Sequence, residues 1–487
     1  MATSISRASP LPQKPRLERQ PIYWYYGSAA TAFGIKNNAF SYLLLIYSNQ
    51  VLKLPGYLAS LALALAMLWD SFADLLIGHW SDKTSSRLGR RHPFMYVAMI
   101  VLPISFYALF NPIIPLDHSN TFAYVLAAAI LIRTGTALFE GPSTALLPGL
   151  ESDYDRRSQW LVLRHGFGWY GGNGIHTINF FFWVGAYGVA AQRGYSIYGI
   201  VGALLIFAAI VVSTLGTQRA AAALPRPTET FRLKEIAREI RQIFESVRNR
   251  NFAALFFYGL AVGVAGGLGT ALYLYNTTYF FGFTGQQIAT TGIGVLLSPL
   301  IAYWAAPYFG SRFGKRRAAI GAILLNIALY PIPYALLLSG HWPPLGSWIA
   351  LYIYSCFIVA EVVFAIIGGV LLDSMMADVV EDSELVTTRR SEGLFFAARG
   401  FAAKAISAGG IIGAGSIVSL VGLDGVTSVT QVTPEIRQHL AMFFLPLYCS
   451  LYLLGLYIVS RYKIDRAGHT ANLEELSRRK QVANGVA

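Results

Sequence analysis

The chain has few charged residues and almost no cysteine. Asp, Glu, Lys and Arg make up 13% of its 487 residues, which is about half the share that soluble domains carry. This composition excludes an ordinary soluble enzyme and indicates a membrane-embedded chain. The two cysteines, Cys356 and Cys449, lie in apolar runs. They exclude a disulfide framework and a cysteine-rich metal site, and we expect both side chains to be buried.

Apolar runs long enough to cross the hydrocarbon core recur along the whole chain. Twelve spans are predicted, near residues 23–47, 55–79, 94–112, 122–147, 165–187, 197–215, 252–279, 285–309, 318–338, 346–373, 394–421 and 439–460. The predicted fold is therefore an all-α polytopic membrane protein with twelve transmembrane helices.

The positive charge is placed on one side of these spans. The formal charge is +13, and 31 Lys and Arg residues lie in the N-terminus, the even-numbered connections and the C-terminal tail, against Lys53, Arg193 and Arg437 in the odd-numbered connections. Excess basic residues stay on the cytoplasmic side of a membrane. We therefore predict a multi-pass protein of the cell membrane, such as a bacterial inner membrane, with both termini cytoplasmic. The lipid bilayer accounts for the basic charge, so neither a nucleic acid nor a protein partner is implied.

The longest connection divides the chain into two halves. The predicted parts are a cytoplasmic N-terminal tail (1–22), a six-helix half (23–215), a cytoplasmic linker (216–251), a second six-helix half (252–462) and a cytoplasmic tail (463–487). Within the linker, apolar residues at helical spacing over 231–247 indicate a basic amphipathic helix. Such a helix lies on the membrane surface or packs on the ends of the spans, and the pattern fits both.

The two halves carry a matched motif. Gly89-Arg90-Arg91 follows the second span, and Gly314-Lys315-Arg316 follows the eighth, 225 residues later. Cytoplasmic charge alone explains the basic residues, but the matched glycine and its matched place favour an internal repeat. Two repeated halves are a transporter architecture, in which the substrate site lies near the bilayer midplane between them.

Two carboxylates lie inside the second span, in "AMLWDSFADLLIGHW" (66–80). A charged side chain at the bilayer centre costs about 3 kcal/mol on insertion scales, so Asp70 and Asp74 require a partner or a function. Their spacing of four residues puts them on one face of a helix. Close carboxylates bind a hard cation such as Na⁺ or share a proton. The alternative is that a buried Lys or Arg neutralises them.

Further charged residues are predicted inside spans four and eleven. Glu140 precedes a Gly-Pro pair that interrupts its helix, and Arg133 lies two turns earlier, so an internal Arg133–Glu140 contact is an alternative to a ligand site. Lys404 lies in "GFAAKAISAGG" and requires a carboxylate partner. Asp70, Asp74 and Glu140 are the candidates.

Four segments together resemble one known family. They are "WDSFADLLIGHWSDKTSSRLGRRHPF", "EGPSTALLPGLESDYDRRSQWLVLR", "MMADVVEDSELVTTRRSEGLFF" and "FAAKAISAGG". In this order the chain resembles the glycoside–pentoside–hexuronide cation symporters, the melibiose-permease branch of the major facilitator superfamily, over nearly its whole length. The resemblance implies two pseudo-symmetric six-helix halves in the major facilitator superfamily fold. It also implies a coupling ion and no other cofactor.

The resemblance implies roles for individual residues. Asp70 and Asp74 look like ligands of the coupling cation (metal ligands if that cation is Na⁺), and Glu140 sits where an acid joins the cation and substrate sites. Arg164 resembles an arginine that contacts substrate, and Lys404 resembles the lysine that balances the cation. The residues that resemble the cytoplasmic gate are Asp82, Arg90, Arg91, Asp378 and Arg390.

The chain departs from the family pattern at the sugar site. The first span, "TAFGIKNNAF", has no carboxylate and offers Lys36, Asn37 and Asn38, while Thr144 stands where the family has a sugar-stacking tryptophan. Neutral oxygen ligands near the cation site are replaced by Ala73 and Ala137, which slightly favours H⁺ over Na⁺. The remaining candidates for the substrate site are Arg133, His165, Asn173, His176, Asn179 and Glu361.

The predicted function is a cation-coupled (H⁺ or Na⁺) symporter that imports a small molecule by alternating access, namely a glycoside, an oligosaccharide or a uronide. Arg133, Arg164 and Lys404 favour an anionic uronide, because arginine pairs with carboxylates. The first alternative is a lysophospholipid-like amphiphile, since lysophospholipid symporters keep the paired aspartates and the lysine but lack the sugar platform. A membrane enzyme has less support, because no long connection carries a ligand cluster or a nucleophile motif. No enzymatic activity is predicted.

Overall fold

The computed structural model describes residues 22–151, 153–224, 249–387 and 392–462, with 464, 474, 475 and 478 beyond them. The predicted linker helix over 231–247 and both tails lie largely outside these residues. In the described part, the crossings of the first half are formed by α1 (Ile22–Asn38) with η1 (Ala39–Leu43), α2 (Leu44–Ile46) and η2 (Tyr47–Val51), then α3 (Gly56–Lys83), α4 (His92–Phe110), α5 (Thr121–Thr144), α7 (Tyr154–Phe182) and α9 (Gln192–Ala222). Short helices α6 (Leu147–Leu150) and α8 (Val184–Tyr187) lie between crossings.

The second half repeats this order. Its crossings are α11 (Arg250–Tyr275) with η3 (Asn276–Phe280), α12 (Gly285–Phe313), α13 (Lys315–Leu329) with α14 (Ile332–Leu338), α15 (Trp348–Thr387), α16 (Glu392–Leu420) and α17 (Pro434–Val459), and a short turn η4 (Val429–Gln431) precedes α17. The predicted all-helical architecture of twelve crossings is therefore confirmed. Nine of the described helices are both long and apolar enough to span a bilayer on those criteria alone. The first crossing is interrupted by π-helical segments, and α7 begins with a polar stretch.

Several helices begin directly after a residue whose side chain caps the first turn. Thr284 accepts a hydrogen bond from the backbone N–H of Gln287, whose side chain bonds back to Thr284, so a capping box begins α12. Asn249 and Thr433 cap α11 and α17 in the same general way. Each cap satisfies backbone N–H groups that a helix leaves unpaired at its first turn.

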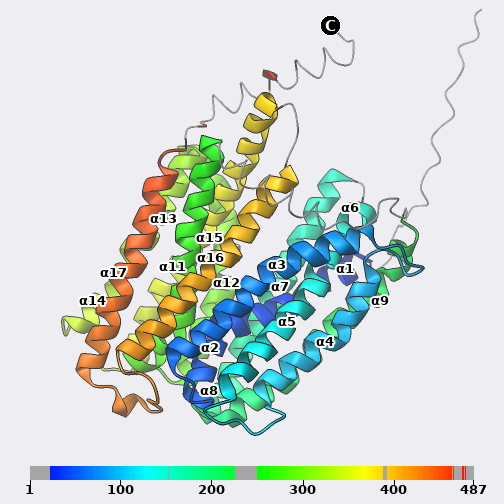
Figure 1. Cartoon of the computed structure of the whole chain (residues 1–487). Helices are drawn as coiled ribbons and strands as arrows, with labels where there is room; N and C mark the ends of the chain where they lie inside the picture. The colour runs from blue at the N-terminus through cyan, green and yellow to red at the C-terminus, as the bar shows by residue number, and fades with distance from the viewer. Residues whose placement is uncertain are drawn as a thin grey trace, which may run out of the picture.

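The crossings pack into two bundles that lie side by side (Figure 1). Helices α1 to α9 contact mainly one another and form the first bundle, and α11 to α17 form the second bundle. The main contacts between bundles are α3 with α16 and α7 with α12. Figure 1 shows the bundles together near α2 and α8 and apart at the opposite end, where α6 and the C-terminal end of α15 lie. We call the first end the outer end and the second the cytoplasmic end, following the orientation that the basic residues predict.

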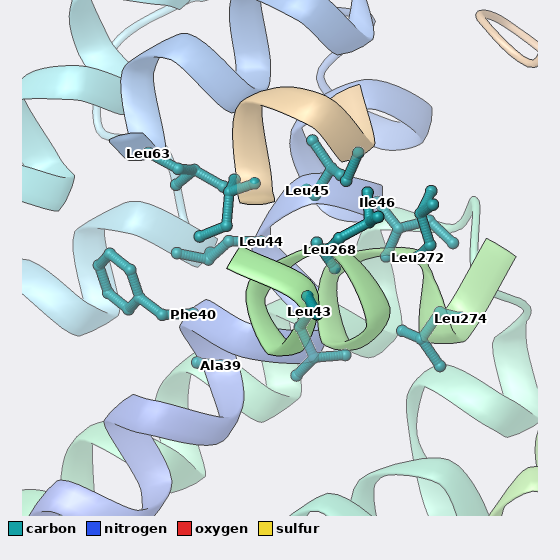
Figure 2. Close-up of a cluster of buried hydrophobic side chains, with 14 of the residues drawn as sticks. Ala39, Phe40, Leu43, Leu44, Leu45, Ile46, Leu63, Leu268, Leu272 and Leu274 are labelled. Carbon is teal, nitrogen blue, oxygen red and sulfur yellow. The ribbon is translucent and has the colours of Figure 1, made fainter. Parts of the chain in front are cut away.

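An apolar seam joins the bundles beside the interrupted first crossing. Leu43, Leu44 and Ile46 are fully buried and lie next to Leu268 and Leu272 of α11 (Figure 2). π-Helical turns widen a helix and are frequent at functional sites. Here η1 carries the chain past the seam and places Tyr42 toward α11, where its ring centroid lies 5.5 Å from that of Tyr273.

Hydrogen bonds across the bundles close the outer end. The carboxylate of Asp424, in the connection after α16, accepts from the Asn49 amide at 2.7 Å and from the backbone N–H of Gly56 at 2.9 Å. Gln50 donates to the carbonyl oxygen of Leu423 at 3.0 Å, and Tyr275 donates to the Asn49 side chain at 3.0 Å. These bonds hold the first crossing and α3 against the second bundle.

The repeated glycines have the same backbone conformation. Gly89 has φ +91° and Gly314 has φ +80°, in the left-handed region that favours glycine. Each glycine turns the chain between consecutive crossings, which is why both motifs need a glycine at this place and not only basic residues. This shared geometry supports the internal repeat.

The expected burial of the cysteines is wrong for one of them. Cys356 is exposed on α15, and Cys449 is partly buried on α17; both are free thiols. The surface that exposes Cys356 also exposes Trp348, Ile349 and Tyr352. An apolar run in a membrane protein has a lipid-facing side, so an apolar neighbourhood in the sequence does not imply burial inside the protein.

Candidate solute and cation sites

Asp70 forms a buried ion pair between α3 and α5. Its Oδ2 atom accepts from Nη1 of Arg133 at 3.1 Å, and the two residues are 1% and 5% exposed. The Arg133 guanidinium also lies over the ring of Phe40, 4.1 Å from its centroid. The alternative partner that the sequence suggested for Arg133, Glu140, is therefore wrong for this conformation. Arg133 neutralises the deeper of the two span-two carboxylates.

Asp74 and Glu140 lie on the same two helices as the Asp70–Arg133 pair, nearer to the cytoplasmic end. Helices α3 and α5 are packed together and both run from the outer to the cytoplasmic end. Asp74 is one turn beyond Asp70, about 6 Å along the axis, and Glu140 is two turns beyond Arg133, about 10 Å along the axis. Both are partly exposed. In the described part of the chain no three His, Cys, Asp or Glu side chains gather as a metal site does.

Arg164 on α7 is buried among neutral partners. It donates to the hydroxyl oxygens of Ser143 and Thr144, each at 2.8 Å, and to the carbonyl oxygen of Tyr26 at 3.2 Å. The centroid of the Tyr26 ring lies 4.8 Å from the guanidinium carbon of Arg164. Thr144, which replaces the family's tryptophan, is thus a partner of Arg164.

A cavity of about 210 Å³ lies between the bundles. From the first bundle it is lined by Tyr42 of η1 and by Asn173, His176 and Thr177 of α7. From the second bundle it is lined by residues of five crossings: Gly266, Gly269, Thr270, Tyr273, Gly292, Val295, Tyr330, Ile358, Glu361, Val362, Tyr448 and Tyr452. Two candidates from span five, Asn173 and His176, and Glu361 from span ten therefore meet at one place.

The other candidates lie elsewhere. Lys36 is buried on α1, whereas Asn37 is exposed and it is Asn38 that donates to Asn173, at 3.1 Å. His165 is exposed, and Asn179 is buried near the outer end of α7. Lys404 lies on α16 among residues whose side chains fall outside the described part, and Arg390 also lies outside the described residues.

Three of the five expected gate residues, Asp82, Arg91 and Asp378, form ion pairs at the cytoplasmic end, and Asp378 pairs with Lys315, which was not among them. Arg91 donates to Asp82 at 2.6 and 3.0 Å, and it also bonds the carbonyl oxygen of Ala145. In the second bundle Lys315 donates to both oxygens of Asp378, at 2.7 and 3.0 Å. Burial lowers the pKa of Arg91, and the Asp82 carboxylate acts in the opposite direction. Each pair stays within its own bundle, which agrees with the separation of the bundles at this end.

The aromatic lining of the cavity was not predicted from the sequence. Five tyrosines from four different crossings line it: Tyr42, Tyr273, Tyr330, Tyr448 and Tyr452. Tyr330 and Tyr448 stack with centroids 4.3 Å apart. Each tyrosine lies in an apolar run in which an interfacial or lipid-facing role is equally compatible with the pattern. Only the packing of the helices selects these five.

Twelve crossings in two repeated bundles with a central cavity define a transporter of the major facilitator superfamily. The chain belongs to the MFS/sugar transport protein family, which matches residues 25–466. This match confirms the family resemblance that the sequence motifs indicated. It also confirms the prediction that the protein is a transporter and not an enzyme.

Individual relatives are distant. The chain is 21% identical over 474 residues to the glucuronide carrier protein homolog of Escherichia coli K12, covering 95% of this chain and 96% of that protein. It is 24% identical over 393 residues to the lactose permease of Lactobacillus delbrueckii subsp. bulgaricus, covering 77% of this chain and 58% of that protein. The chain spans between 33% and 58% of the length of this permease and of two other curated relatives.

Solved structures share the fold at low identity. A bacterial homolog of the human lysosomal transporter Spinster, in an inward-facing and unoccupied conformation, superimposes with a TM-score of 0.65 at 12% identity, covering 93% of this chain and 97% of that one. At this identity the likeness shows the fold alone.

Proposed function

We propose that the protein is a cation-coupled symporter that imports a glycoside or a related solute by alternating access. The observation that carries the proposal is the buried Asp70–Arg133 pair, with Asp74 and Glu140 along the same two helices. A cation or a proton at these acids competes with arginine for the same negative charge. Its binding therefore changes the charge balance between α3 and α5 inside the first bundle.

The coupling follows from differential affinity. A ligand shifts a conformational equilibrium only as far as it binds one state better than the other. With the bundles closed at the outer end, Arg133 pairs with Asp70, and Asp74 and Glu140 are partly exposed for release of the ion. We propose that the ion is loaded from the outer side, together with the solute, and leaves from the cytoplasmic end.

The cavity supports a glycoside over the lysophospholipid-like alternative. Its lining includes an acid, an asparagine, a histidine, two threonines and five tyrosines, and polar groups of this kind orient a hydroxylated solute. An acyl chain has no hydrogen-bonding groups to meet them.

Accumulation measurements test the proposal. In proteoliposomes we expect radiolabelled lactose or methyl β-D-glucoside to accumulate when an inward H⁺ or Na⁺ gradient is imposed, and an ionophore for that ion to abolish accumulation. Imposing the two gradients separately identifies the ion.

Neutralising the partly exposed acids supplies the residue-level test. We expect Asp74→Asn and Glu140→Gln each to lower gradient-driven accumulation at least tenfold, because the ion loses a ligand, while solute exchange at equal concentrations persists. Glu435→Gln, at an exposed position that begins α17, is the matched control and should behave as wild type. Uptake that depends on neither the H⁺ nor the Na⁺ gradient would contradict cation coupling. So would accumulation that stays at the wild-type level in both Asp74→Asn and Glu140→Gln.

A further inference from the structure

The cavity between the bundles has an acidic and aromatic lining. Glu361 is the one charged side chain among the described residues that line it. The buried arginines that the sequence suggested for an anionic substrate are occupied elsewhere: Arg133 by Asp70, and Arg164 by Ser143 and Thr144. A carboxylate on the solute would meet the acidic Glu361 and no Lys or Arg side chain among the described lining residues, so its charge would be buried without a partner.

Glu361 has capacity to accept hydrogen bonds from a solute. Its Oε1 atom accepts from the Asn326 amide at 3.4 Å, and Asn326 also donates to the Glu361 backbone carbonyl at 3.2 Å. These two contacts hold the α15 side chain against α13. A carboxylate accepts about four hydrogen bonds, so the Asn326 contact leaves acceptor positions for hydroxyl groups.

His176 faces the same cavity from the first bundle. It is 9% exposed, and its Nδ1 atom has no hydrogen-bond partner among the described residues. The rings of Tyr42 and Phe180 lie 5.3 and 4.9 Å from the imidazole, centroid to centroid. A buried polar atom without a partner in a folded protein points to a missing partner.

The aromatic side chains complete a site for a ring with one polar edge and two apolar faces. Tyr42 and Tyr273 pack edge to face on one side, and Tyr330 and Tyr448 are stacked on another. Asn173, Thr177 and Thr270 line the cavity as well. Polar side chains from several helices suit a solute with several hydroxyl groups better than a solute with a single charged group.

We infer that this cavity binds an uncharged, polyhydroxylated solute of glycoside type, whose hydroxyl groups are held by Glu361 from the second bundle and His176 from the first. The inference rests on the proposed function, deepens it, and assigns the specificity against uronides to Glu361. It replaces the expectation, drawn from the number of basic residues, of an anionic substrate. Because the two residues belong to different bundles, a solute that contacts both also joins the bundles.

Equilibrium binding tests this assignment. The full chain is reconstituted in lipid nanodiscs, so that no glycosidic detergent competes, and the shift of its thermal unfolding midpoint is measured. The probes are lactose, methyl β-D-glucoside and methyl β-D-galactoside, with methyl β-D-glucuronide and glucosamine as charged counterparts and lysophosphatidylcholine as the amphiphile. We expect a concentration-dependent stabilisation by at least one neutral glycoside and at least tenfold weaker binding of the glucuronide.

Variants locate the binding groups. Glu361→Gln keeps the shape of the side chain and an acceptor for Asn326, and we expect its dissociation constant for the neutral glycoside to rise at least tenfold. His176→Asn should give a similar loss, whereas Glu435→Gln should bind as wild type. The unfolding midpoint of each variant without ligand shows whether it is folded, and a variant that does not fold is replaced by Glu361→Asp and His176→Gln.

The contrary outcomes are distinct. Tighter binding of the glucuronide, of glucosamine or of lysophosphatidylcholine, a panel in which no glycoside binds, or glycoside binding that Glu361→Gln leaves unchanged would each overturn the assignment. Binding that depends on Glu361 without gradient-driven uptake would instead overturn the proposed symport and leave the solute site standing.

Discussion

Replacing Asp70 with asparagine is expected to lower the free energy of unfolding by about 3 kcal/mol or more, since the loss of one partner leaves a buried charge uncompensated. Arg133 is 5% exposed and lies against Phe40, so water does not take the place of the carboxylate. The measurement is chemical or thermal unfolding of the purified protein in a fixed detergent, compared with wild type.

The companion substitution separates charge from packing. In Asp70→Asn/Arg133→Met both charges are gone and the volume is nearly kept, so no uncompensated buried charge remains. We therefore expect the double variant to be more stable than Asp70→Asn alone, with a large coupling energy in the double-mutant cycle. Glu435→Gln, at an exposed position, should change the unfolding free energy by less than about 1 kcal/mol. Additive effects of the two substitutions would mean that the pair is not an energetic unit.

The same double variant distinguishes stability from transport. If Asp70 serves only to neutralise Arg133, the double variant should keep coupled uptake along with its stability. The proposed function requires the opposite: a stable protein in which the cation no longer drives accumulation. A stable double variant with full accumulation would remove Asp70 from the coupling mechanism.

Much of the fold could be predicted from the sequence because the bilayer imposes strong rules. A span must be long, apolar and helical to cross the hydrocarbon core, since no water is there to satisfy backbone groups. The twelve predicted crossings follow from that rule, and the polar residues Asn173 and His176 of α7 were candidates for the substrate site. The glycines at 89 and 314 could be matched because a left-handed φ leaves a signature in the residue type.

The partners inside the membrane could not be predicted, because they depend on which helices touch and in which register. Arg133 has Glu140 on its own helix, yet it pairs with Asp70 because α5 packs along α3. Asp424 bonds a residue 375 positions earlier in the chain, Asn49, from within a connection that has no distinctive sequence pattern. The π-helical segments that place Tyr42 also follow no composition rule. Sequence reasoning therefore named the charged residues but not their contacts.

Introducing a valine at Gly415 is expected to shift the protein toward a conformation that is open at the outer end. A Cβ atom at this position would lie 2.2 Å from the carbonyl oxygen of Gly56 and 2.2 Å from the Ser60 hydroxyl, both on α3 of the other bundle. Real Cβ atoms do not approach backbone oxygen so closely, so α3 and α16 must separate here. Because this contact joins the bundles, the strain is relieved by moving them apart.

The size of the shift follows from the usual cost of overpacking, which is about 1–3 kcal/mol. Since about 1.4 kcal/mol corresponds to a factor of ten in an equilibrium constant, the ratio of outward-open to inward-open molecules should rise about tenfold or more. The reporter is a cysteine in place of Thr270, which lines the cavity, in a background where Cys356 and Cys449 are replaced by serine and alanine. A membrane-impermeant maleimide, added to the outer side of right-side-out vesicles, should label it correspondingly faster.

Two further variants make the result specific to the contact between bundles. Gly409→Val lies on the same helix, but a Cβ there meets no atom within 4 Å, so its labelling rate should equal that of the reporter background. Gly285→Ala introduces a clash at a second contact between bundles, where a Cβ would lie 2.0 Å from the Cα of Gly185. This substitution alone should also increase the labelling rate. Equal rates for Gly415→Val and Gly409→Val would show that the outer closure does not depend on the approach of α3 and α16. Faster labelling in Gly415→Val and Gly285→Ala but not in Gly409→Val requires that the two bundles move as bodies about the solute cavity, as alternating access demands.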